Sequence, residues 1–167
     1  VRLHDCTVPG STSHSIRVGN QYANPSAALA HHVLIENNVV QNAVLENGVF
    51  PNCGSGAWGS GIKAEKGSAF VTIRGNVVHD VCGEAIAVTM SPDAVIENNL
   101  VYKSWAVAIY SDASPRTLIQ NNLVTCEAQY VGGRESFAIA SGYEYYSGWN
   151  AGRDGLRIIN NTVQGCR

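Results

Sequence analysis

The stretch Ile96-Glu97-Asn98-Asn99-Leu100-Val101 decides the fold, because the chain repeats its spacing of Ile, Asn and Val five times. The other copies occupy residues 35–40, 73–78, 119–124 and 158–163. Their Ile residues are 38, 23, 23 and 39 positions apart along the chain. A unit of about 23 residues, lengthened twice by an insertion, indicates a repeat architecture rather than a single globular core.

The residue before each repeated Asn is Gly or Asn, the residue types that most readily adopt a left-handed backbone. One sharp turn is therefore predicted at the same place in every repeat. These corner residues are Asn37, Gly75, Asn98, Asn121 and Asn160. The pattern predicts a strand that contains the Ile, a left-handed corner, a buried Asn and a second strand.

Each unit also contains three short runs in which β-branched residues alternate with small or polar ones, as half-buried strands require. In one unit these runs are Phe70-Val71-Thr72-Ile73, Val77-Val78 and Ala85-Ile86-Ala87-Val88. Stacking such units in parallel places the repeated Asn residues in one column, where each amide can bond the coils above and below. These bonds satisfy buried groups that would otherwise cost about 1–3 kcal/mol each. The predicted asparagine ladder consists of Asn38, Asn76, Asn99, Asn122 and Asn161.

The repeats resemble those of the right-handed parallel β-helix family, which includes the pectate-lyase-like proteins. The resemblance covers nearly the whole chain and implies an all-β solenoid of about six coils, forming a single domain over residues 1–167. Insertions are expected at about 43–61 and 141–155. Because residues 2–6 resemble residues 78–82 in the middle of a repeat, we expect this chain to be a piece of a longer one. Within the family the fold serves lyases, hydrolases, epimerases, tailspikes and adhesins, so the fold alone does not choose a function.

The composition suits one compact or elongated domain and narrows the choice of partners. The 167 residues are 45% hydrophobic and 14% charged, with a formal net charge of −2. This balance gives no reason to expect nucleic acid or an anionic membrane as a partner. The chain has no run of about 18 apolar residues, which excludes a membrane-spanning helix. The family resemblance implies a secreted or cell-surface protein.

The five cysteines show no spacing typical of zinc ligands. Cys6, Cys82, Cys126 and Cys166 are expected in roughly the same corner of the coil. Adjacent coils lie about 4.8 Å apart, so in an exported protein Cys53 could bond to Cys82 and Cys126 to Cys166. The alternative is a stack of small buried thiols.

In the β-helix family one strand of each coil commonly lines the substrate groove. The resemblance assigns this role to the strands that contain Ile16, Ile62, Ile86, Ile109 and Ile139. With the Ile side chains inward, the following residue of each strand points outward. The outward column is Arg17, Lys63, Ala87, Tyr110 and Ala140. Two positions further along, the same face carries Gly19, Glu65, Thr89, Asp112 and Gly142, and His14 and Glu84 stand just before the strand.

Arg17, Lys63 and Glu65 on adjacent coils predict a charged cluster on this groove. A lyase that acts on uronate sugars needs a base to take the proton next to the carboxylate and a cation to stabilise the resulting charge. Arg17 and Lys63 are the candidate base and charge neutraliser. Glu65 and Glu84 are the candidate ligands of a Ca²⁺ ion, which supplies part of that charge in such families. The alternative is a solvated cluster of ions without a catalytic role.

The insertion at 141–155 is rich in aromatic residues and leaves from the end of a predicted groove strand, where functional loops are often found. Aromatic faces stack on sugar rings, and the insertion at 43–61 is expected to form the opposite wall. The candidate sugar contacts are Tyr110, Tyr143, Tyr145, Tyr146 and Trp149, with Trp58 and Trp105 extending the platform. The alternative is a loop whose aromatic side chains cover apolar surface of the coil.

Two functions follow from these patterns. The first is an exported carbohydrate-active or carbohydrate-binding module for acidic polysaccharide, acting by β-elimination if it is an enzyme. Hydrolysis is the weaker expectation, because it needs clustered carboxylates and outward Asp residues are scarce. The second is a non-catalytic structural segment, adhesin or filament subunit whose coil ends stack on another subunit or on the rest of the parent chain.

Overall fold

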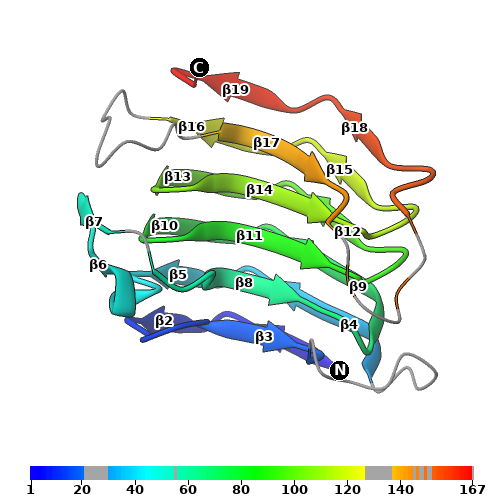
Figure 1. The fold of residues 1–167 in the computed structure, drawn as a ribbon, viewed down its shortest axis with the longest axis horizontal. Helices are drawn as coiled ribbons and strands as arrows, with labels where there is room; N and C mark the ends of the chain where they lie inside the picture. The colour runs from blue at the N-terminus through cyan, green and yellow to red at the C-terminus, as the bar shows by residue number, and fades with distance from the viewer. Residues whose placement is uncertain are drawn as a thin grey trace.

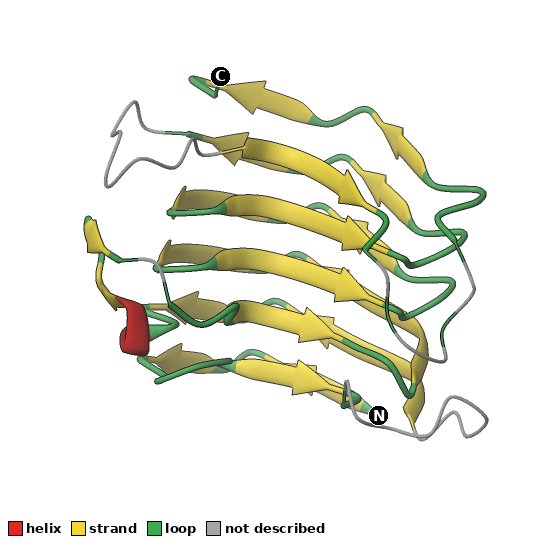
Figure 2. Cartoon of the chain, in the orientation of Figure 1, coloured by secondary structure: helices red, strands yellow, loops and turns green. Residues whose placement is uncertain are grey.

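The computed structural model describes residues 1–20, 30–54, 56–126, 137–144, 146, 149 and 152–166. These residues form strands joined by short turns, and their one helix is a single 3-10 turn at Leu45–Asn47 (Figure 2). Within these residues no helix has the length and hydropathy needed to cross a membrane.

The strands form three parallel sheets, and strands of successive coils lie beside one another from the N-terminal to the C-terminal end (Figure 1). Sheet A contains, in order, β1 (Arg2–His4), β4 (Ala30–Glu36), β9 (Ser68–Arg74), β12 (Val95–Glu97), β15 (Leu118–Gln120) and β18 (Arg157–Ile159). Sheet B contains β2 (Thr7–Pro9), β5 (Val39–Gln41), β10 (Val77–Val81), β13 (Leu100–Ser104), β16 (Leu123–Thr125) and β19 (Thr162–Gln164). Sheet C contains β3 (Ile16–Val18), β8 (Ser60–Ala64), β11 (Glu84–Thr89), β14 (Val107–Asp112) and β17 (Phe137–Gly142).

The chain visits sheets A, B and C in turn, so the architecture is the predicted parallel β-helix, with six coils among the described residues. Each coil places one apolar side chain above the equivalent residue of the coil before it. In sheet A, Ile35 pairs with Ile73, and Ile96 pairs with both Ile73 and Ile119. All four side chains are fully buried, so the interior consists of stacked columns of branched aliphatic residues.

The corner between sheets A and B has the left-handed backbone that the sequence predicts. The φ angles of its five corner residues lie between 54° and 62°: Asn37, Gly75, Asn98, Asn121 and Asn160. The turn points the following Asn into the interior, where all but the last of these side chains are buried.

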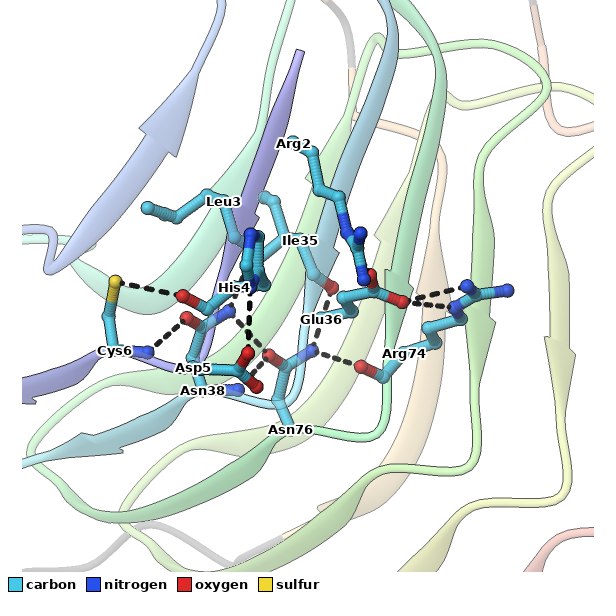
Figure 3. A network of polar contacts seen from close by, with 10 residues as sticks. All are labelled: Arg2, Leu3, His4, Asp5, Cys6, Ile35, Glu36, Asn38, Arg74 and Asn76. Carbon is cyan, nitrogen blue, oxygen red and sulfur yellow. Dashed lines mark hydrogen bonds and ion pairs between the residues drawn. The ribbon is translucent and has the colours of Figure 1, made fainter.

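The inward Asn side chains form a continuous ladder of hydrogen bonds. The Nδ2 of Asn76 donates to the Oδ1 of Asn99 at 3.0 Å, and the Nδ2 of Asn99 donates to the Oδ1 of Asn122 at 3.0 Å. The same contacts link Asn38 to Asn76 and Asn122 to Asn161. Figure 3 shows the N-terminal end of this ladder, where the Nδ2 of Asn38 also donates to the carbonyl oxygen of Leu3.

The first coil differs from the expected alignment. Strand β1 pairs with β4, so Leu3 lies beside Ile35, and Cys6 occupies the position that Asn holds in later coils. The backbone N–H of Cys6 donates to the Oδ1 of Asn38 at 3.1 Å and ends the ladder (Figure 3). The prediction that Cys6 shares a corner with Cys82 was therefore wrong.

The other four cysteines form two disulfides. Cys53 bonds to Cys82 and Cys126 bonds to Cys166, whereas Cys6 is free. Of the two alternatives that the sequence left open, the structure has the disulfides. The Cys53–Cys82 bond anchors the antiparallel hairpin of β6 (Gly48–Val49) and β7 (Asn52–Cys53), which projects beside the stacked coils (Figure 1).

Candidate functional site in a groove on sheet C

The outward face of sheet C brings the predicted polar side chains into register. Arg17 pairs with Lys63, Lys63 with Ala87, Ala87 with Tyr110, and Tyr110 with Ala140. These pairs form the outward column that the Ile alignment predicts.

A groove of about 620 Å³ lies over this face. Sheet C and its adjoining residues form its floor, and parts of both insertions form its walls. The lining residues are Ser13, His14, Arg17, Ala57, Trp58, Lys63, Glu65, Glu84, Thr89, Tyr110, Glu144 and Tyr146. Charged and aromatic side chains from five coils thus face one space.

The predicted cluster of Arg17, Lys63 and Glu65 is a network of ion pairs that is mostly shielded from solvent. Arg17 donates from Nε and Nη2 to the Oε2 of Glu65 at 2.9 and 2.6 Å. The Nζ of Lys63 lies 3.6 Å from the Oε1 of Glu65 and 4.0 Å from the Oε2 of Glu84. The side chains of Lys63 and Glu65 are only 10% and 2% exposed, so this part of the cluster is not a solvated surface patch.

Glu84 is a buried carboxyl group beside Lys63. It stands at the start of β11, it is buried, and its Oε2 accepts a hydrogen bond from the Ser60 hydroxyl at 3.1 Å. Burial raises the pKa of Glu84 above its ordinary value of 4.5, and the nearby Lys63 ammonium offsets only part of that rise. A carboxyl group with a raised pKa can give up and take back a proton closer to neutral pH.

His14 reaches the groove from the segment before β3. Its Nδ1 accepts a hydrogen bond from the backbone N–H of Ser60 at 3.0 Å, so in the neutral ring the proton is on Nε2. Burial and then the Lys63 charge lower the pKa of His14 below 6.5. His14 therefore offers a neutral N–H donor rather than a base.

The other end of the groove is acidic. Asp112 is fully buried at the end of β14 and accepts hydrogen bonds from the backbone N–H of Glu144 at 2.9 Å and from the Tyr146 hydroxyl. The Glu144 carboxylate is exposed, and the hydroxyls of Tyr110 and Tyr146 each lie 3.2 Å from it. Burial, together with the charges of Asp112 and Glu144, raises the pKa of both tyrosines, which therefore remain hydrogen-bond donors.

The predicted aromatic contacts lie in different places. Tyr110, Tyr146 and Trp58 line the groove. Tyr143 is exposed outside that lining, and Trp149 donates from Nε1 to the carbonyl oxygen of Ala113 at 2.8 Å. Tyr145 lies outside the described residues.

Trp105 is a correction to the predicted aromatic platform. Its side chain belongs to the interior of the coil and is buried. It stands just before Ala106 and β14, where the chain turns from sheet B towards sheet C, so its ring packs inward.

The proposed metal ligands are already occupied by protein cations. Glu65 binds Arg17 and Lys63, and Glu84 lies beside Lys63 and Ser60. In the part of the chain that the structure describes, no group of three or more His, Cys, Asp and Glu side chains is arranged to hold a metal ion.

Sequence reasoning missed Glu144 and undervalued His14 and Asp112. His14 and Glu144 stand outside the strands, so strand periodicity could not place them. Asp112 does fall in the outward column, but its role depends on the segment after β17 folding back over it. The sequence feature that could have indicated them is their position, because all three residues stand at an end of a sheet C strand or just outside it.

The Cys53–Cys82 disulfide supports the wall that carries Trp58, and its loss has two expected effects. The double variant Cys53→Ser, Cys82→Ser should lower the free energy of unfolding by about 3 kcal/mol, because the bond restricts the unfolded chain. It should also be cut sooner by proteases between β7 and β8. Urea unfolding and limited proteolysis measure the two effects. The matched control is Cys126→Ser, Cys166→Ser. If proteases cut between β7 and β8 at the same rate in both double variants, the Cys53–Cys82 bond would not be what supports this wall.

Comparison with known proteins agrees with the observed fold. The family model for the right-handed β-helix region matches residues 1–167, and the chain belongs to that family. A search of curated proteins finds no match. Among solved structures, the chain is similar to the A-module of the mannuronan C-5 epimerase AlgE4 from Azotobacter vinelandii, with a TM-score of 0.49 and 16% sequence identity. The similarity covers 83% of this chain and 42% of that one.

Proposed function

We propose that the chain is a carbohydrate-active β-helix module that binds an acidic polysaccharide in the sheet C groove and cleaves it by β-elimination. The observation that carries the proposal is the position of Glu84, a buried carboxyl group 4.0 Å from the Lys63 ammonium in a polar groove. β-Elimination at a uronate needs this combination of a proton-transfer group and a neighbouring cation.

The proposed reaction moves one proton and breaks one bond. Arg17 and Lys63 bind the carboxylate of a uronate sugar and neutralise part of its negative charge. The proton on the carbon next to that carboxylate then becomes more acidic. Ionised Glu84 takes that proton, the electron pair forms a carbon–carbon double bond, and the glycosidic bond to the neighbouring carbon breaks. Glu84 then returns the proton to the leaving oxygen, so the enzyme ends in its starting state without consuming water.

The ion pairs give Lys63 and Arg17 the role of charge neutralisers. The Lys63 ammonium lies between two carboxylates, Glu65 and Glu84, and Arg17 donates two hydrogen bonds to Glu65, so both side chains are placed as cations. Tyr110 and Tyr146 do not fit the role of the base either, because their raised pKa values keep the hydroxyls protonated. Glu84 is the side chain of the groove that fits the proton-transfer role.

The same features favour elimination over hydrolysis. Hydrolysis needs two carboxyl groups on opposite sides of the scissile bond, one of which attacks or activates water. At the Arg17 and Lys63 end of the groove, Glu65 is bound by both cations, and Glu84 shares one of them. We also propose a secreted or cell-surface location, because two disulfides are typical of proteins from oxidising compartments.

A panel of polysaccharides tests the proposal. The protein is incubated with pectate, alginate and unsulfated glycosaminoglycan, and the products are followed by ultraviolet absorbance and by reducing ends. We expect the ultraviolet absorbance of an unsaturated uronate from at least one substrate, and its loss in Lys63→Ala. Reducing ends without this absorbance would show hydrolysis instead. No product and no binding, with a mass that rises with concentration, would favour the structural or filament function.

A further inference from the structure

The two ends of the groove differ in charge, because its cationic side chains all stand at one end among the described lining residues. Among the described residues that line it, Arg17 and Lys63 are the only Arg or Lys side chains, and both stand on the first two strands of sheet C, β3 and β8. Glu144 stands just beyond β17 at the opposite edge of the sheet, next to the buried Asp112. A bound chain that runs across the strands therefore passes from a region where carboxylates are paired with Arg17 and Lys63 to one where the carboxylates have no Arg or Lys among the described lining residues.

The Glu144 carboxylate is held in place rather than left to swing into solvent. Its backbone N–H is fixed by the Oδ1 of Asp112 at 2.9 Å, and the Tyr110 and Tyr146 hydroxyls lie 3.2 Å from its two oxygens. The Tyr110 hydroxyl donates to this carboxylate, whereas the shorter hydrogen bond of the Tyr146 hydroxyl goes to Asp112. The Asp112 contact with the backbone and the Tyr110 hydrogen bond position the carboxylate at the groove. Unlike an Arg or Lys partner, these neutral contacts do not cancel its charge.

A fixed carboxylate in a partly enclosed groove discriminates between sugars by charge. A sugar hydroxyl donates a hydrogen bond to it, whereas a second uronate would place two negative charges side by side. The same uronate is attracted at the Arg17 and Lys63 end. A polysaccharide with a carboxylate on every sugar would thus be favoured at one end of the groove and disfavoured at the other.

We infer that Glu144 is a specificity-determining residue, which excludes carboxylated sugars from the β14–β17 end of the groove. The inference rests on the proposed function, and it refines the substrate to a polysaccharide in which uronates are separated by uncharged sugars. Glu144 acts by repulsion of the wrong substrate as well as by hydrogen bonding to the right one.

Binding measurements with oligosaccharides of equal length test this inference. The probes are an alternating hyaluronan oligosaccharide and two homopolymers, oligogalacturonate and oligoguluronate, compared by calorimetry at low salt. We expect the wild-type chain to prefer the alternating oligosaccharide. Glu144→Gln should reduce this preference about tenfold, because the repulsion is removed while the side chain keeps its size. Asp5→Asn, which removes one negative charge at the corner between β1 and β2, is the matched control and should leave the preference unchanged.

The outcomes separate this inference from the proposed function. Equal binding of alternating and homopolymeric oligosaccharides by the wild-type chain, or an unchanged preference in Glu144→Gln, overturns the role of Glu144 and leaves the polysaccharide groove standing. No binding of any oligosaccharide overturns both. Thermal unfolding of Glu144→Gln should match the wild type, since Glu144 is exposed.

Discussion

Glu84→Gln is expected to lower the rate of polysaccharide cleavage about a hundredfold to ten-thousandfold, the usual range for loss of a general acid or base. Gln has the size of Glu and can still accept the hydrogen bond from the Ser60 hydroxyl, but it cannot take a proton from the substrate. The cations Arg17 and Lys63 remain, so binding of the oligosaccharide should change much less than the rate. Initial rates and binding constants for the two proteins measure this difference.

The same substitution is expected to make the folded chain more stable near neutral pH. Because burial raises the pKa of Glu84, the folded state holds a proton at pH values where the unfolded state has released it. The free energy of unfolding contributed by Glu84 therefore decreases as pH rises from 4.5 through the raised pKa. Glu84→Gln removes this decrease, so its stability should depend less on pH than that of the wild type.

The pH dependence of the rate gives a second check. The first step needs Glu84 in its ionised form, so the rate should fall as pH is lowered through the raised pKa of Glu84, at a pH above 4.5. The matched control is Glu97→Gln, on sheet A, where the carboxylate accepts a hydrogen bond from Gln120. Full activity in Glu84→Gln, or equal losses in both variants, would contradict the role of Glu84.

The stacked columns could be predicted from sequence because each coil repeats the same physical requirements. A β-branched side chain must fill the interior, a left-handed residue must turn the corner, and an inward amide must bond the next coil. These requirements recur with the same internal spacing of Ile, corner residue and Asn in five coils, from Ile35 to Asn161. The register of sheet C then followed from counting residues between one Ile column and the next.

The alignment of the first coil was wrong for a physical reason. The dipeptide His-Asp occurs at both His4-Asp5 and His79-Asp80, and both Asp residues have a φ of 54°. The same dipeptide thus forms the corner after β1 and a bend within β10. Only the pairing of β1 with β4 shows that Asp5 corresponds to Asn37 rather than to Asp80.

The groove was only half predictable. The alternation of residues along the strands placed Arg17, Lys63 and Tyr110 on one face. How far each side chain is buried, and therefore how strongly its charge interacts with its neighbours, cannot be read from that alternation. The position of Glu144 depends on contacts between an insertion and Asp112. Such contacts have no repeat, because each coil carries a different insertion or none.

Asn99→Ala is expected to destabilise the fold by about 4 kcal/mol, because it removes the centre of the ladder and takes a hydrogen bond from each of four buried groups. The Oδ1 of Asn99 accepts from the backbone N–H and the Nδ2 of Asn76, and its Nδ2 donates to the Oδ1 of Asn122 and the carbonyl oxygen of Ile73. Each of these four groups would lose a hydrogen bond inside a column that water does not reach. Urea unfolding followed by circular dichroism measures the loss.

The neighbouring Asn98 supplies the matched control, since it is the same residue type with a different task. Asn98 is exposed and has a φ of 55°, and its counterpart in the preceding coil is Gly75. Asn98→Gly should therefore change the free energy of unfolding by less than about 0.5 kcal/mol. If Asn99→Ala were as mild as Asn98→Gly, the ladder would contribute little, and the stability of the coils would come from the aliphatic columns alone. A large loss confined to Asn99→Ala would show that the buried amide, not the corner, makes each coil depend on the next.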